Sequence, residues 1–110
     1  MRSVCTITMG TLLALSCGSA VAHSDTRARD LASTCANCHG TSGKAQGAVP
    51  ALAGQSRSDL IQKMNDFRDG KRPATIMHQQ ARGYTDTQLQ SIAAYFAAVK
   101  PAPAARPAKP

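Results

Sequence analysis

The chain has 110 residues, which is enough for one domain and too few for several. It carries 13 Lys and Arg against six acidic side chains, for a formal charge of +7. Charge alone permits nucleic acid, an anionic membrane or an acidic protein as partner, and it also fits an ordinary solvated surface. There is no Trp, and alanine supplies much of the apolar fraction, so we expect a small core. Domains with so little apolar volume often recruit a metal, a disulfide or a cofactor.

The first 22 residues have the pattern of a secretory signal peptide. A positive start precedes a mostly apolar run at residues 4–15, and residues 18–22 end in a small-x-small pattern, which predicts cleavage after Ala22. An uncleaved anchor is disfavoured because the apolar run is too short to span a bilayer. Lipoprotein processing at Cys17 is disfavoured because Ala14 fits the first position of that pattern poorly. We therefore expect an exported, periplasmic product with no transmembrane segment, for which nucleic acid is the least favoured partner.

Removal of this leader reduces the number of cysteines and methionines and the net charge. Cys35 and Cys38 are the cysteines that remain, Met64 and Met77 are the methionines, and loss of Arg2 leaves a formal charge of +6. We expect one domain at residues 23–100, followed by a flexible, extended Pro- and Ala-rich tail at residues 101–110.

Three amphipathic helices are predicted within the domain. The first is capped by Ser24 or Asp25 and runs to about residue 38. The second begins at the S-x-x-D pattern of residues 56–59 and ends at Gly70. The third begins at the T-x-x-Q capping box of residues 85–88 and ends before Pro101. Their apolar faces are, in chain order, Ala28, Leu31, Ala32 and Cys35; Leu60, Ile61, Met64 and Phe67; and Leu89, Ile92, Ala93, Phe96 and Val99. Residues 40–54 and 71–84 are predicted to be irregular.

The sequence Cys35-Ala36-Asn37-Cys38-His39 carries the decisive chemistry. This C-x-x-C-H arrangement is the attachment pattern of c-type haem. Two thiols one helical turn apart can reach both vinyl groups on one edge of a porphyrin, and the histidine then places its imidazole beneath the iron. The motif therefore predicts thioether bonds from Cys35 and Cys38 and an axial iron ligand at His39.

Three other interpretations of the two cysteines are weaker. A thioredoxin-like redox pair would need a βαβ setting, and no strand pattern is present. A structural zinc site would need four ligands, whereas two cysteines and three scattered histidines remain. A disulfide between residues so close together would be strained, although an oxidising compartment permits one.

Met77 is the favoured sixth ligand of the iron. It lies in the irregular segment at residues 71–84, where a thioether could come over the distal face, and His/Met ligation raises the reduction potential. Met64 competes with it but shares an apolar stripe, where methionine usually serves packing. His78 is a less favoured ligand that we expect to be exposed, and binding through it would lower the potential. His23 is expected to face solvent.

The sequences CANCHG, VPALAGQ, DLIQKMNDFRDGKRPATIM and GYTDTQLQSIAAYFAAV, in this order, resemble a class I cytochrome c. Within that class the chain is similar to the haem subunit of flavocytochrome c sulfide dehydrogenase and to related short bacterial monohaem cytochromes. The resemblance covers residues 25–99 and implies an all-α cytochrome c fold, with three main helices around one covalently bound haem c. It also implies that Cys35 and Cys38 form the thioethers, that His39 and Met77 bind the iron, and that the Pro50 carbonyl accepts the proximal imidazole N–H. An ordinary turn proline is the alternative at Pro50.

Electron transfer is the function that these assignments predict. With both axial positions filled by protein, the domain is expected to relay single electrons rather than to be an enzyme. The resemblance implies a redox protein partner, with a flavoprotein sulfide dehydrogenase as the first candidate. The alternatives are a diffusible carrier between a dehydrogenase and a terminal oxidase, or a haem peroxidase or gas sensor with a labile Met ligand. Basic residues such as Lys44, Lys71, Arg72 and Arg82 are candidates for steering an acidic partner.

Overall fold

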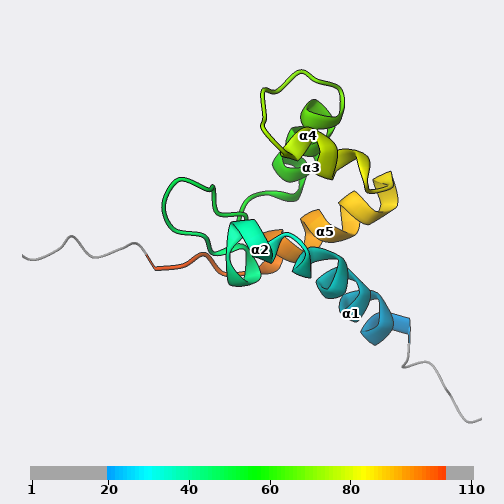
Figure 1. The fold of residues 1–110 in the computed structure, drawn as a ribbon. Helices are drawn as coiled ribbons and strands as arrows, with labels where there is room; N and C mark the ends of the chain where they lie inside the picture. Colours follow the sequence, from blue (N-terminus) through cyan, green and yellow to red (C-terminus); the bar gives the residue numbers. More distant parts are fainter. Residues whose placement is uncertain (1–19, 104–110) are drawn as a thin grey trace, which may run out of the picture.

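The computed structural model describes residues 20–103, with side chains described from residue 25 onward. Most of the predicted leader, the side chain of His23 and most of the predicted tail therefore lie outside the described residues. The elements, in chain order, are α1 (Ala20–Ser33), α2 (Ala36–His39), the 3-10 turn η1 (Thr41–Gly43), α3 (Arg57–Arg68), α4 (Met77–Arg82) and α5 (Asp86–Ala98). Residues 20–103 contain no strand, and the all-α prediction is confirmed (Figure 1).

Within the same range, no helix has the length and apolar character needed to cross a membrane.

The first predicted helix differs from the structure at both ends. α1 already runs from Ala20, so Ser24 and Asp25 lie within the helix instead of capping it. It ends at Ser33 instead of continuing to Cys38, and α2 follows after a turn. At the break, the hydroxyls of Ser33 and Thr34 donate to the carbonyls three residues earlier, at 2.6 and 3.0 Å. Such side-chain bonds to the backbone compete with a regular helix.

Local capping explains why α3 and α5 begin where the sequence predicts. The Ser56 hydroxyl accepts from the Asp59 N–H at 3.1 Å at the start of α3. At the start of α5, Thr85 Oγ1 accepts from the Gln88 N–H and the Gln88 amide oxygen accepts from the Thr85 N–H. Each arrangement satisfies backbone donors that the first turn of a helix leaves open. Both predicted helix starts are confirmed.

Helix α5 is the centre of the packing. It lies against α1 on one side and α3 on the other, and α4 packs on α3 (Figure 1). The buried core is formed by Ala32 from α1, Leu60 from α3 and three residues of α5, namely Ile92, Ala93 and Phe96. Phe96 is 1% exposed, and burial of such a side chain contributes about 1.5–3 kcal/mol. Parts of the predicted apolar faces of the three main helices therefore meet in one small core.

Two short elements interrupt segments that were predicted to be irregular. The 3-10 turn η1 lies in the loop at residues 40–54, and α4 lies in the segment at residues 71–84. α4 is only six residues long, so its apolar period is too short to recognise in the sequence. Its position comes from packing, because Ala81 is fully buried there.

Gly43, the last residue of η1, lies directly against the ring of Phe96. Its φ is +71°, and a Cβ at this position would come within 2.7 Å of two ring carbons of Phe96. The backbone of η1 can therefore approach α5 this closely only without a side chain.

Replacement of Thr85 by alanine should lower the free energy of unfolding by about 1 kcal/mol, because it removes the acceptor of the Gln88 N–H. Urea unfolding followed by helical circular dichroism measures this change. Thr87→Ala, at an exposed position in the same helix, is the matched control and should change the free energy by less than about 0.5 kcal/mol. Equal losses in the two variants would contradict the role of the cap.

Gly43→Ala should cost about 1–3 kcal/mol more of unfolding free energy than Gly70→Ala. Gly70 is the matched control because its φ is +73°, almost the same as at Gly43, but an added Cβ there would meet nothing within 4 Å. Both variants carry the cost of a left-handed backbone, so the difference isolates the clash with Phe96. The same unfolding measurement applies, and similar losses at both positions would show that the approach to Phe96 is not constraining.

Candidate haem site

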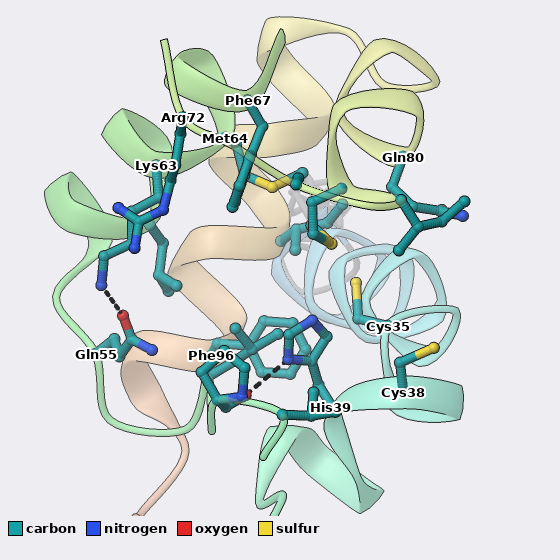
Figure 2. A pocket seen from close by; sticks show the side chains of 18 of the residues that line it. Cys35, Cys38, His39, Gln55, Lys63, Met64, Phe67, Arg72, Gln80 and Phe96 are labelled. Carbon is teal, nitrogen blue, oxygen red and sulfur yellow. Dashed lines mark hydrogen bonds between the residues drawn. The ribbon is translucent and has the colours of Figure 1, made fainter. Parts of the chain in front are cut away.

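A cavity of about 610 Å³ lies among α2, α3, α4, α5 and the loop at residues 44–54 (Figure 2). This volume is within the range of cofactor pockets, about 300–1,000 Å³. Its wall is mostly apolar and includes Leu52, Leu60, Phe67, Leu89, Ile92 and Phe96. Several of these residues also belong to the core, so the cavity opens directly from the small hydrophobic interior.

The two cysteines lie at one edge of this cavity. Cys35 is half-buried in the turn between α1 and α2, Cys38 is exposed on α2, and both thiols are free. Burial raises the pKa of the Cys35 thiol, an effect that its hydrogen bond to Thr34 partly offsets. Figure 2 shows both sulfur atoms on the same side of the cavity, as the pattern of two thiols one turn apart predicts.

His39, the last residue of α2, is buried, with 8% of its surface exposed, and lines the cavity. Its Nδ1 lies 2.7 Å from the carbonyl oxygen of Pro50. Because a carbonyl can only accept, Nδ1 carries the proton and donates, which leaves Nε2 as the nitrogen with a free lone pair. The hydrogen bond fixes both the tautomer and the plane of the ring, as is usual for a metal-binding histidine.

Pro50 is held in position by the base of its own loop. The carbonyl of Gly43 accepts from the N–H groups of Leu52 and Ala53, at 2.8 and 3.0 Å, and closes the loop. The Gly54 N–H donates to the carbonyl of Phe96 at 2.9 Å and ties the end of the loop to α5. The acceptor for His39 is therefore supported by the core rather than by a free loop.

Both methionines line the cavity. Met77 is the first residue of α4 and Met64 lies on α3, and each side chain is half-buried. Met64 was expected to pack in the core, but it lies outside the core cluster and lines the cavity instead. His78 is half-buried rather than exposed and is not part of the cavity wall. It follows Met77 in α4, and adjacent residues of a helix face different directions.

The donors at this site suit a haem. They comprise a buried imidazole whose Nδ1 is bonded to Pro50, two methionine thioethers, and two thiols at a common edge, around a mostly apolar cavity. Imidazole and thioether are the axial ligands of electron-transferring cytochromes c, and the two thiols match covalent attachment. The fold and the site together define a c-type haem protein.

Comparison with known proteins agrees with this class. The sequence matches the family model for cytochrome c over residues 26–100. The chain therefore belongs to the cytochrome c family, whose haem c is covalently attached, and its C-x-x-C-H motif at Cys35 and Cys38 is the attachment pattern.

Relatives of this chain include proteins named for sulfide dehydrogenase and thiosulfate dehydrogenase. It is similar to the cytochrome subunit of sulfide dehydrogenase from Chlorobaculum tepidum, with 36% identity over 66% of this chain and 66% of that protein. The thiosulfate dehydrogenase electron acceptor of Stutzerimonas stutzeri is 42% identical over 59% of this chain and 32% of the relative. The solved thiosulfate dehydrogenase of Marichromatium purpuratum superposes with a TM-score of 0.67 at 30% identity, over 76% of this chain and 20% of the other. The chain thus spans about two thirds of the first relative and a third or less of the other two.

Sequence reasoning missed the polar part of the cavity wall. Gln55, Lys63 and Arg72 line it, although Arg72 was grouped with surface residues that could steer a partner. A signal existed for Lys63, which lies three residues after Leu60 and four before Phe67 and so shares the face of α3 that turns toward the cavity. Arg72 lies outside any helix, so no spacing of residues in the sequence indicates that it lines the cavity.

Proposed function

We propose that this protein is a periplasmic electron carrier that holds one haem c through thioether bonds from Cys35 and Cys38, with His39 and Met77 as axial ligands. The buried imidazole of His39 is the observation that carries the proposal, because its bond to Pro50 leaves Nε2 available at the cavity. When bound, the haem supplies a one-electron iron couple. The chain supplies the two axial donors, the orientation of the imidazole and an apolar wall that excludes water.

Two protein donors leave no coordination position for a substrate, which favours a carrier over an enzyme. Thioether ligation and burial in an apolar wall favour the less charged ferrous state and so raise the reduction potential. Export, which we infer from the predicted signal peptide, would place the carrier where c-type cytochromes of this kind meet sulfur-oxidising dehydrogenases.

The partner we propose is a flavoprotein sulfide dehydrogenase. The similarity to the cytochrome subunit of sulfide dehydrogenase supports this choice. The similarity to a thiosulfate dehydrogenase electron acceptor favours a second candidate, a diffusible carrier that receives electrons from such a dehydrogenase.

Met77→Leu should abolish the methionine–iron charge-transfer band of the ferric protein, lower the reduction potential and allow rapid carbon monoxide binding by the ferrous protein. Met64→Leu is the matched control, because it makes the same nearly volume-conserving change in the same cavity and should keep the band. Optical spectra and a redox titration of the two holoproteins measure these effects. Loss of the band in Met64→Leu and its retention in Met77→Leu would assign the axial ligand to Met64.

Gentle size-exclusion chromatography of the natively expressed protein, with haem and flavin absorbance recorded together, tests the partner. We expect haem to co-elute with flavin above the monomer mass, and sulfide to reduce the haem in that fraction. A lone small haem peak that is reduced by a thiosulfate dehydrogenase would support the diffusible carrier instead. A purified protein without haem would contradict the proposed function as a whole.

A further inference from the structure

Two positive charges lie in the mostly apolar wall of the cavity. Among the described residues that line it, Lys63 and Arg72 are the cations, and no Asp or Glu is present. Lys63 is half-buried on α3, whereas Arg72 is exposed in the segment that follows this helix. Within residues 25–103 neither side chain forms an ion pair, whereas the neighbouring Lys71 pairs with Asp69 at 3.3 Å. A half-buried cation beside an apolar space, such as Lys63, is costly unless an anion or a strong acceptor compensates it.

Both cations are held in fixed positions. The Lys63 ammonium donates to the Gln55 amide oxygen at 2.5 Å, and the Gln55 amide nitrogen donates to the Ala51 carbonyl. The Arg72 guanidinium lies over the ring of Phe67, 5.4 Å from its centroid, which is a cation–π arrangement. The backbone N–H of Arg72 also donates to the Asp66 carbonyl at 3.2 Å. Such restraint lowers the entropy lost when a ligand binds.

Figure 2 shows Lys63, Gln55 and Arg72 together on one side of the cavity, with Cys35 and Cys38 on the other side. The imidazole of His39 lies between the two groups in this view. The cavity therefore has a polar, cationic end and a thiol end.

A haem has the same polarity across its plane. Its two vinyl groups, which form the thioethers, lie on one side of the ring, and its two propionates lie on the side away from them. Attachment through Cys35 and Cys38 consequently directs the carboxylates toward the end that holds the cations. Two ammonium or guanidinium donors match two carboxylates in charge and in hydrogen-bonding capacity.

We propose that Lys63 and Arg72 bind the two haem propionates and that Gln55 positions Lys63 for this contact. The inference rests on the proposed function, because it requires a haem tethered at Cys35 and Cys38. Positive charge at this end stabilises the ferrous state, which carries one positive charge fewer than the ferric state. It also keeps the propionates ionised, since a nearby cation lowers the pKa of a carboxyl group.

Charge removal in the holoprotein tests the proposal. Lys63→Gln and Arg72→Gln should each lower the reduction potential at constant pH and salt, and the double variant should lower it further. Lys71→Gln is the matched control, because it removes the same charge one residue from Arg72, at a side chain that is 69% exposed and paired with Asp69. This control should leave the potential unchanged, since Lys71 does not line the cavity and its charge is paired with Asp69. Lys63→Arg should retain the potential of the unaltered protein.

The pH dependence of the potential separates propionate binding from a merely structural role. In the double variant the propionate pKa should rise by about 1–3 units, so the potential should fall with rising pH in a higher pH range than before. The fall has this sign because deprotonation favours the ferric state. The other titratable side chains of the cavity wall in the holoprotein, His39 and Tyr84, are identical in all variants.

The outcomes separate this proposal from the proposed function. Covalent haem and an intact methionine–iron band in every variant, with the potential and its pH profile unchanged, would overturn the propionate site and leave the carrier function standing. An equal shift in Lys71→Gln would also overturn it, because the effect would then be one of net charge. Absence of covalent haem from the unaltered protein would instead contradict the proposed function.

Discussion

The hydrogen bond between His39 and Pro50 is the interaction on which the rest of the site depends. It joins the end of α2 to a loop eleven residues away, and it selects which imidazole nitrogen is free. The loop can offer this carbonyl because the carbonyl of Gly43 closes its base and Phe96 anchors its end. The geometry of one ring is thus supported by a chain of backbone contacts that runs back into the core.

The core and the cavity share the same apolar side chains, and this sharing is a consequence of the small size of the domain. Leu60, Ile92, Ala93 and Phe96 belong to both. A chain with so few large apolar residues cannot fill the space between α3, α4 and α5 by itself, so the space between them stays open. A flat apolar cofactor fits this space chemically and would complete the interior, which makes haem binding part of the stability of the fold as well as of its function.

The parts of the structure that the sequence predicts are those determined locally. The starts of α3 and α5 can be predicted from Ser56 and Thr85, because an N-cap contacts only residues in the first turn of its own helix. The break after Ser33 involves a hydrogen bond from its hydroxyl to the Asp30 carbonyl, and α4 depends on packing against α3. Neither feature could be predicted from the spacing of apolar residues in the sequence. The C-x-x-C-H motif indicates the haem by itself, whereas the contact with Pro50 was expected only through family resemblance. The place of Arg72 in the cavity wall is a tertiary property of a returning loop, and its sequence neighbours give no indication of it.

Two successive peptide carbonyls of the same loop hold side chains in two different parts of the cavity wall. Pro50 accepts from His39, and Ala51 accepts from Gln55, which in turn holds Lys63. Because both acceptors belong to the main chain, no side-chain replacement can delete them, and a replacement can only change where they lie. Replacement of a neighbouring side chain, such as that of Ala48 or Val49 in the cavity wall, therefore leaves both acceptor carbonyls in the chain. A shift of this loop would therefore move the His39 imidazole and the Gln55–Lys63 pair together.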